Sequence, residues 1–240
     1  MKAKPMAACS AIVLAASSVL AEPPPPAPPA PPAAETALDA AEAAEDVRIL
    51  RKALTDYHPG WARYVSAEAM NLAFDDLERD TAGGVTDLEL HYRVSRITAM
   101  MRCDHTIAEV PPRIVAWRSE HPTHLPFRLD IRDGRAFIAR ADEGQPVLQQ
   151  GDEIIAINSI PIGRLIAEVN PLIGIDGFTE SARGAVLEYS SEIPSGAIDA
   201  FYPALHGYAD SFTIDVRRAA ASDTWHRRRA TVKAVTYPRY

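Results

Sequence analysis

The spacing of apolar residues predicts helices in the first part of the chain. In residues 39–57 apolar positions recur at helical intervals with charges between them, and His58-Pro59-Gly60 ends the pattern. Ser66 then precedes a second segment, residues 67–80, whose apolar residues fall mostly on one side. Serine is a favoured helix N-cap, so the second helix is expected to begin directly after Ser66.

A capping box marks a third helix. Thr86 is followed three residues later by Glu89, and the apolar pattern continues to Met101. Because the connections between the three helices are short, the sequence predicts a small helical bundle over residues 36–106.

From Arg113 onward the pattern changes to one typical of strands. Asp133-Gly134 favours a type I′ hairpin turn between two alternating stretches. Strands are expected at residues 127–132, 135–140, 212–216 and 230–235.

The stretch from Gln149 to Ile162 organises this second part. Gly151-Asp152 makes a turn into the apolar strand 154–157, and Asn158-Ser159 makes the next turn. Helices are expected after it at residues 163–169 and 179–189.

The string Gly-Asp-Glu-Ile-Ile-Ala-Ile-Asn at residues 151–158, followed by a turn and Pro-Ile, resembles the middle of bacterial PDZ domains. An alternative is a buried hairpin in an unrelated β-rich domain. The resemblance implies an α+β fold, with a small N-terminal helical bundle followed by a PDZ-like β-rich domain at residues 107–240.

The N-terminus predicts export. Residues 1–21 carry Lys2 and Lys4, an apolar stretch and small residues at the end, the pattern of a cleaved signal peptide and not of a permanent membrane anchor. Residues 22–35 are almost wholly proline and alanine and predict an extended linker. A periplasmic or secreted product is expected.

Charge and cysteine content narrow the function classes. Loss of residues 1–21 removes two lysines and no acid, which moves the formal charge from −7 to −9. An acidic protein without a basic stripe is not expected to bind nucleic acid. Cys103 is the single cysteine left after Cys9 is removed, so no internal disulfide is expected.

Several motifs together resemble the N-terminal half of the tail-specific, or C-terminal-processing, serine peptidases. These are the first helix, His58-Pro59-Gly60, the third helix, Cys103-Asp104-His105-Thr106 and the PDZ-like stretch, in this order. In the branch related to the tricorn core protease, the resemblance implies that His105 is the general base toward a serine. The alternative is that His105 only ends the helix and bonds locally.

The nucleophile is not evident in this sequence. Residues 36–240 hold no Gly-x-Ser-x-Gly elbow, and Lys52 and Lys233 are poorly placed for a Ser-Lys pair. Helix-face, capping and turn roles explain the remaining serines better than catalysis: Ser181, Ser190, Ser191 and Ser195. His121 and His124 lack a nearby third ligand, so no metal site and no cofactor is expected.

Peptide binding is the activity that this part of the resemblance implies. A PDZ domain adds a partner's C-terminal residues as a strand to a sheet edge and holds the terminal carboxylate with loop N–H groups. That loop is expected at residues 123–127, with Leu125 and Phe127 lining an apolar pocket. The groove helix is expected to present Leu165, Ile166 and Val169, whose alternative role is to face the core.

Three functions follow as hypotheses. The first is the non-catalytic front portion of an exported tail-specific serine peptidase, either as a truncated product or as one member of a split pair whose partner is a separate catalytic domain. The second is a free-standing periplasmic PDZ-like adaptor that binds the C-terminal peptide tails of proteins. The third is a structural or inhibitory protein whose groove is filled.

Overall fold

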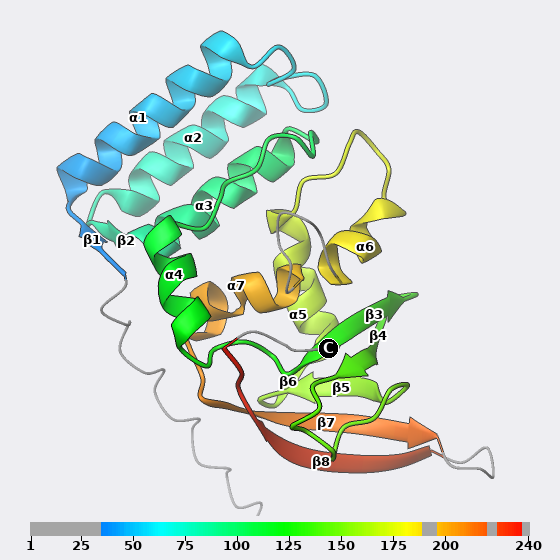
Figure 1. Cartoon of the computed structure of the whole chain (residues 1–240). Coiled ribbons are helices and arrows are strands. Elements are labelled where there is room, and N and C mark those ends of the chain that lie inside the picture. The colour runs from blue at the N-terminus through cyan, green and yellow to red at the C-terminus, as the bar shows by residue number, and fades with distance from the viewer. Residues whose placement is uncertain (1–34, 189–195, 220–224, 237–240) are drawn as a thin grey trace, which may run out of the picture.

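The computed structural model describes residues 35–188, 196–219 and 225–236. The predicted signal peptide, residues 22–34 of the predicted linker, and Ser190, Ser191 and Ser195 lie outside these ranges. None of the helices in the described ranges combines the length and the apolar character needed to cross a membrane. In Figure 1 a set of helices forms one end of the molecule and a sheet the other.

The three predicted N-terminal helices are present. Helix α1 spans Ala40–Tyr57, α2 spans Ala67–Thr81 and α3 spans Asp87–Met100. Asp39 caps α1, Ser66 caps α2, and Thr86 with Glu89 makes the capping box of α3. Before α1 and α3, the short strands β1 (Ala37–Leu38) and β2 (Val85–Thr86) pair antiparallel and tie the starts of these helices together.

The helices enclose their own apolar core. The side chains that meet there come from one face of each helix, as the spacing predicts. They are Val47, Leu54, Met70, Phe74, Leu77, Ile97 and Met101.

The sheet is antiparallel, with strand order β3-β4-β5-β7-β8. These strands span Phe127–Arg132, Arg135–Ala141, Glu153–Ile157, Ser211–Ala219 and Trp225–Lys233, and the short β6 (Ile160–Pro161) pairs with β5. The hairpin between β3 and β4 turns at Asp133 and Gly134, whose φ angles of 51° and 72° are both positive, as a type I′ turn requires. Strand β3 lies at one end of this order, so within the described residues one side of it has no strand partner.

Helices cover the inner face of the sheet. These are α5 (Ile162–Val169), the 3₁₀ turn η1 (Asn170–Leu172), α6 (Ala182–Glu188) and α7 (Ala197–His206). Apolar residues of α5 and α7 pack with β3, β4, β5, β7 and β8 in a second, larger core. The α+β prediction, a helical bundle followed by a PDZ-like β-rich region, is confirmed.

Two helices differ from the sequence prediction. Residues Pro112–Glu120 form helix α4, where a β pattern was expected from Arg113. Pro112 supplies the fixed φ that suits a first helical turn, which explains how a helix can follow directly on Pro111. Helix α7 was not predicted, and Pro203 inside it hides its periodicity.

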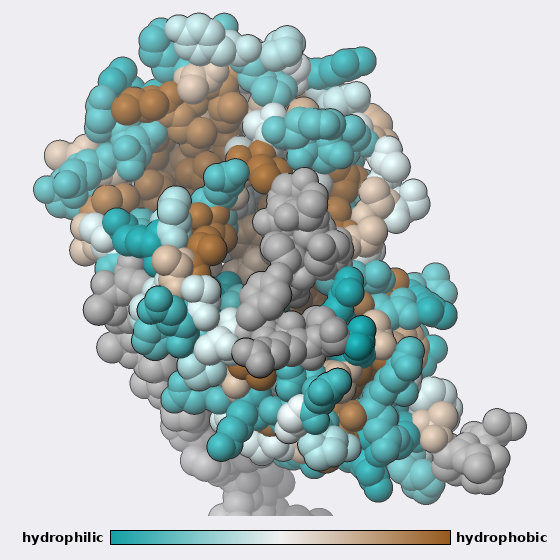
Figure 2. Space-filling view, viewed as in Figure 1, coloured by the Kyte–Doolittle hydropathy of each residue, from teal (hydrophilic) through white to brown (hydrophobic). Residues whose placement is uncertain are grey.

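The sheet half of the molecule has a polar surface. Figure 2 shows mostly hydrophilic side chains over the sheet, while hydrophobic ones are more extensive over the helical half. Arginines of β4 and β7 pair with the one acid of β5, Glu153. Arg135 donates to both carboxylate oxygens of Glu153 at 2.8 Å, and Arg217 also donates to Glu153. Glu153 is therefore paired from both strands that flank β5.

Candidate functional site

The loop predicted to hold a peptide carboxylate already holds a carboxylate of the chain. The N–H of Leu125 donates to Asp199 Oδ1 at 2.9 Å, and Nδ1 of His124 lies 2.6 Å from Asp199 Oδ2. Asp199 comes from α7, 74 residues away from Leu125. One of the expected peptide-binding donors is thus occupied within the molecule.

Asp199 is fully enclosed and charged. Burial acts to raise its pKa, but the His124 hydrogen bond, the Arg118 guanidinium and the Leu125 N–H outweigh burial and hold the pKa of Asp199 below its ordinary value. Arg118 lies 3.7 Å from the carboxylate and also donates to the backbone carbonyl of Asp199 at 3.3 Å. This buried polar network fixes α7 to α4 and to the loop before β3.

The five residues predicted to bind peptide lie in the core. Exposed fractions are 2% for Leu125 and 3% for Phe127, and no more than 9% for the three residues of α5: Leu165, Ile166 and Val169. All five belong to the apolar cluster under the sheet. In this arrangement a peptide reaches them only if their neighbours move, and their binding role stays a prediction.

The helix beside the outer edge of β3 is α6, not α5 as expected (Figure 1). A Cβ on Gly184 would lie 3.6 Å from the carbonyl oxygen of Ile131. The Ile131 N–H donates to Glu188 Oε1 at 2.5 Å. Because no strand in the described part of the chain pairs with this side of β3, Glu188 occupies the position that the carbonyl of an added peptide strand would take.

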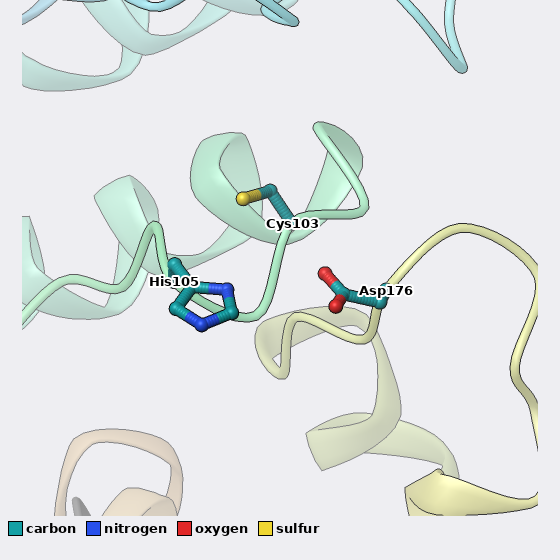
Figure 3. Close-up of side chains that lie close together, drawn as sticks. All are labelled: Cys103, His105 and Asp176. Carbon is teal, nitrogen blue, oxygen red and sulfur yellow. The ribbon is translucent and has the colours of Figure 1, made fainter.

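A second cluster lies where the helical bundle meets the sheet domain. Cys103 and His105 follow α3, and Asp176 lies in the segment between η1 and α6. A sulfur, an imidazole nitrogen and a carboxylate oxygen of these three residues all lie within 4.8 Å of one another. Figure 3 shows the Cys103 sulfur above the His105 ring and the Asp176 carboxylate beside the ring, with the oxygens directed toward it.

Hydrogen bonds hold the two segments of this cluster together. The Gly177 N–H donates to the carbonyl of Arg102 at 2.9 Å, and Arg102 Nη1 donates back to the carbonyl of Gly177 at 2.8 Å. A Cβ on Gly174 would lie 3.1 Å from the carbonyl oxygen of Cys103, so the absence of a side chain there permits the close approach. Direct contacts therefore join the backbone segment that bears Cys103 to the one that bears Asp176.

His105 is exposed and oriented by a neighbouring carboxylate. Its side chain is 85% exposed, and Nδ1 lies 2.6 Å from Asp104 Oδ1. The backbone N–H of Asp104 in turn donates to Asp176 Oδ1 at 3.1 Å, and with the nearby His105 it lowers the pKa of Asp176. Within the described residues no hydrogen bond engages His105 Nε2, so this nitrogen can accept a proton from a group that approaches through solvent.

The two motifs that carried the peptidase resemblance touch each other. His58 Nε2 lies 2.9 Å from Thr106 Oγ1, and His58 Nδ1 accepts the N–H of Gly60 at 3.1 Å. The turn after α1 thereby supports the segment that bears His105.

Sequence reasoning missed three acids that define these sites: Asp176, Glu188 and Asp199. Each contacts its partner across at least 57 residues of chain, and no local pattern marks such contacts. The two histidines that the sequence offered as possible metal ligands have other partners. His124 contacts Asp199, and His121 Nδ1 lies 2.8 Å from the carbonyl oxygen of Trp117.

Residues 121–235 match the sequence profile of the PDZ domain. This part of the chain is a PDZ domain. Its limits enclose the whole sheet from β3 to β8 and the helices α5, α6 and α7. Asp199, His124, Leu125, the Glu188 contact and Asp176 therefore lie within the PDZ domain, whereas Arg118, Cys103 and His105 precede it.

The chain is also similar to solved structures of the protein CPAF. The crystal structure of mature CPAF aligns with a TM-score of 0.44 and 14% identity over 80% of this chain and 34% of that one. The structure of mature CPAF complexed with lactacystin aligns with a TM-score of 0.40 and 14% identity, over 81% of this chain and 34% of that one. The chain thus spans about a third of the length of these structures, and no curated protein matches it.

Proposed function

We propose that the PDZ domain binds apolar peptide tails as an added strand on the outer edge of β3, as the recognition part of an exported tail-specific serine peptidase. The match to the PDZ domain over residues 121–235 supports peptide recognition. The alternative role of a periplasmic adaptor uses the same edge. Export itself rests on the signal-like residues 1–21.

The observation that carries the proposal is the Ile131–Glu188 contact. A backbone N–H on the unpaired side of β3 donates to a carboxylate of α6, so this edge offers a donor directed away from the sheet. A peptide strand would replace the Glu188 oxygen with its own carbonyl oxygen. Displacement of α6 lowers the apparent affinity, because only the fraction of molecules with an open edge binds peptide.

The loop at residues 123–127 limits how much the terminal carboxylate of a peptide adds to the binding affinity. Since the Leu125 N–H already serves Asp199, the terminal carboxylate of a peptide finds this donor occupied. Backbone pairing along β3 then supplies most of the affinity. Tails with a free carboxylate and amidated tails are expected to bind about equally, with micromolar or weaker affinity.

The test is titration of labelled apolar peptides against the full chain and Glu188→Ala. Loss of the Glu188 acceptor frees the Ile131 N–H, and a hydrogen bond to a charged group is worth about 1.5–3 kcal/mol, so affinity is expected to rise about tenfold or more. Glu143→Ala removes the same charge from an exposed loop of the PDZ domain and should leave affinity unchanged. Absence of saturation at millimolar peptide for the full chain and for Glu188→Ala alike would contradict the proposal.

A second candidate function rests on the Asp104–His105 pair. A carboxylate on Nδ1 and an accessible Nε2 are the features of a histidine that takes a proton from a serine. In this role the nucleophile comes from a separate catalytic domain. His105 then acts as general base for hydrolysis, and the PDZ domain delivers the peptide.

Hydrolysis by the polypeptide that the native host exports tests this role. His105→Ala is expected to lower the rate by about 10²–10⁴-fold, the usual contribution of a positioned base, while peptide affinity stays unchanged. His121→Ala, which changes a histidine bonded to its own helix, is the control. An exported polypeptide without hydrolytic activity, or with activity that His105→Ala retains, would exclude the general-base role.

A further inference from the structure

We infer that Cys103, His105 and Asp176 form a binding site for a divalent transition-metal ion of the zinc type. Their ligand atoms already lie within 4.8 Å of one another. Zinc binds sulfur at about 2.3 Å and nitrogen or oxygen at about 2.0–2.2 Å, so ligand atoms around one tetrahedral ion lie about 3–4 Å apart. Rotation of the side chains would shorten the distances between the ligand atoms to this range. The site lies outside the β3 edge and does not depend on peptide binding.

The donor set selects the class of metal. A thiolate and an imidazole are ligands that zinc and its neighbours in the transition series prefer, while Mg²⁺ and Ca²⁺ take oxygen ligands. The Asp176 carboxylate adds a third ligand and a second negative charge. Three protein ligands leave a fourth position for water, the arrangement found in open zinc sites.

The surroundings favour binding because they fix the backbone that carries the ligands. Cys103 and Asp176 lie on segments joined by the reciprocal Arg102–Gly177 hydrogen bonds. Asp104 donates its N–H to Asp176 and places its own carboxylate 2.6 Å from His105 Nδ1. An ion bound at Nδ1, the ring nitrogen that faces Cys103 and Asp176 in Figure 3, would replace the contact with Asp104 and would have the Asp104 carboxylate beside it as a further negative charge.

The consequence for the molecule is competition at His105. A neutral imidazole that binds the ion through Nδ1 carries its one N–H on Nε2, so Nε2 can no longer take a proton from a serine. Metal binding and a general-base role for His105 are therefore mutually exclusive. The cluster is open to solvent, since His105 is 85% exposed, so an ion reaches it without any change in the fold.

The experiment titrates Co²⁺ and then Zn²⁺ into the reduced full chain carrying Cys9→Ala, which leaves Cys103 as the one thiol. One Co²⁺ per chain is expected, with the near-ultraviolet absorption of a thiolate–cobalt bond, and Zn²⁺ should displace it. Cys103→Ser should abolish that absorption. His105→Gln and Asp176→Asn should each weaken Zn²⁺ binding by at least about tenfold, the smallest loss typical of changes around a metal.

His121→Gln is the matched control and should bind Zn²⁺ like the Cys9→Ala chain. Circular dichroism and thermal unfolding report whether each variant is folded, and the exposed His105→Gln tests the site even where another variant is destabilised. Binding that His105→Gln leaves unchanged, or no saturable binding to the Cys9→Ala chain, overturns the inference. Neither result bears on peptide binding, which the Glu188→Ala titration decides separately.

Discussion

Asp199→Ala is expected to lower the free energy of unfolding by about 3–5 kcal/mol, the usual cost of removing one partner from a buried ion pair. The variant leaves the Arg118 guanidinium enclosed without its carboxylate and the Leu125 N–H without an acceptor. Asp199→Asn keeps an oxygen that accepts the Leu125 N–H but removes the negative charge. It should therefore lower the free energy of unfolding less than Asp199→Ala does. Urea unfolding at neutral pH measures both.

The Asp199 carboxylate also makes the free energy of unfolding depend on pH in the acid range. Because the folded-state pKa of Asp199 is below its ordinary value, the unfolded chain binds more protons, and the stabilisation is complete above about pH 4. It is lost as pH falls through the lower pKa of the folded state. The difference in unfolding free energy between the wild type and Asp199→Asn should therefore shrink as the pH falls below about 4.

Asp76→Ala is the control for this series. Asp76 pairs with Arg79 on the surface of α2, and both side chains are more than 60% exposed, so the change should cost no more than about 0.5 kcal/mol. A loss below about 1 kcal/mol for Asp199→Ala would show that the network does not hold α7 to the loop before β3.

The Asp199 network also separates the functional hypotheses. The loop before β3 can bind a carboxylate, since its Leu125 N–H donates to Asp199. The terminal carboxylate of a peptide would have to displace the Asp199 carboxylate, which belongs to the same chain as the loop. This favours recognition through the β3 edge over recognition through the loop. A groove that stays closed even in Glu188→Ala would instead favour the third hypothesis, a structural or inhibitory protein.

The parts of the fold that could be predicted are those fixed by local chemistry. Asp39, Ser66 and Thr86 cap helices because their oxygens reach N–H groups two or three residues ahead. Asp133-Gly134 turns the hairpin because both residues tolerate positive φ. These signals span a few residues, so the sequence alone contains them.

The candidate sites could not be predicted in the same way because they join distant segments. Asp176 meets the N–H of Asp104 72 residues away, and Glu188 meets Ile131 57 residues away. Such contacts depend on how α5, α6 and α7 pack on the sheet, and Pro203 obscures α7. Leu125 and Phe127 were assigned to a ligand pocket from their place in the PDZ order, which does not reveal how much of a side chain is covered.

Phe127→Ala is expected to lower the free energy of unfolding by about 3–5 kcal/mol, as for other buried phenylalanines. Phe127 is 3% exposed at the start of β3 and packs in the apolar cluster under the sheet, so truncation removes its buried area and leaves a cavity. Urea unfolding of the full chain, followed by tryptophan fluorescence and circular dichroism, measures the loss.

Phe178→Ala is the matched control, because Phe178 is 71% exposed and contacts only the edge of Tyr64 and the Arg102 guanidinium among the ring contacts of the described residues. Its loss should be about 1 kcal/mol or less. A Phe127→Ala protein as stable as Phe178→Ala, but unable to bind peptide, would mean that Phe127 faces a ligand groove in solution. The expected large loss means instead that impaired binding by Phe127 variants reports unfolding, so the β3 edge must be tested through Glu188.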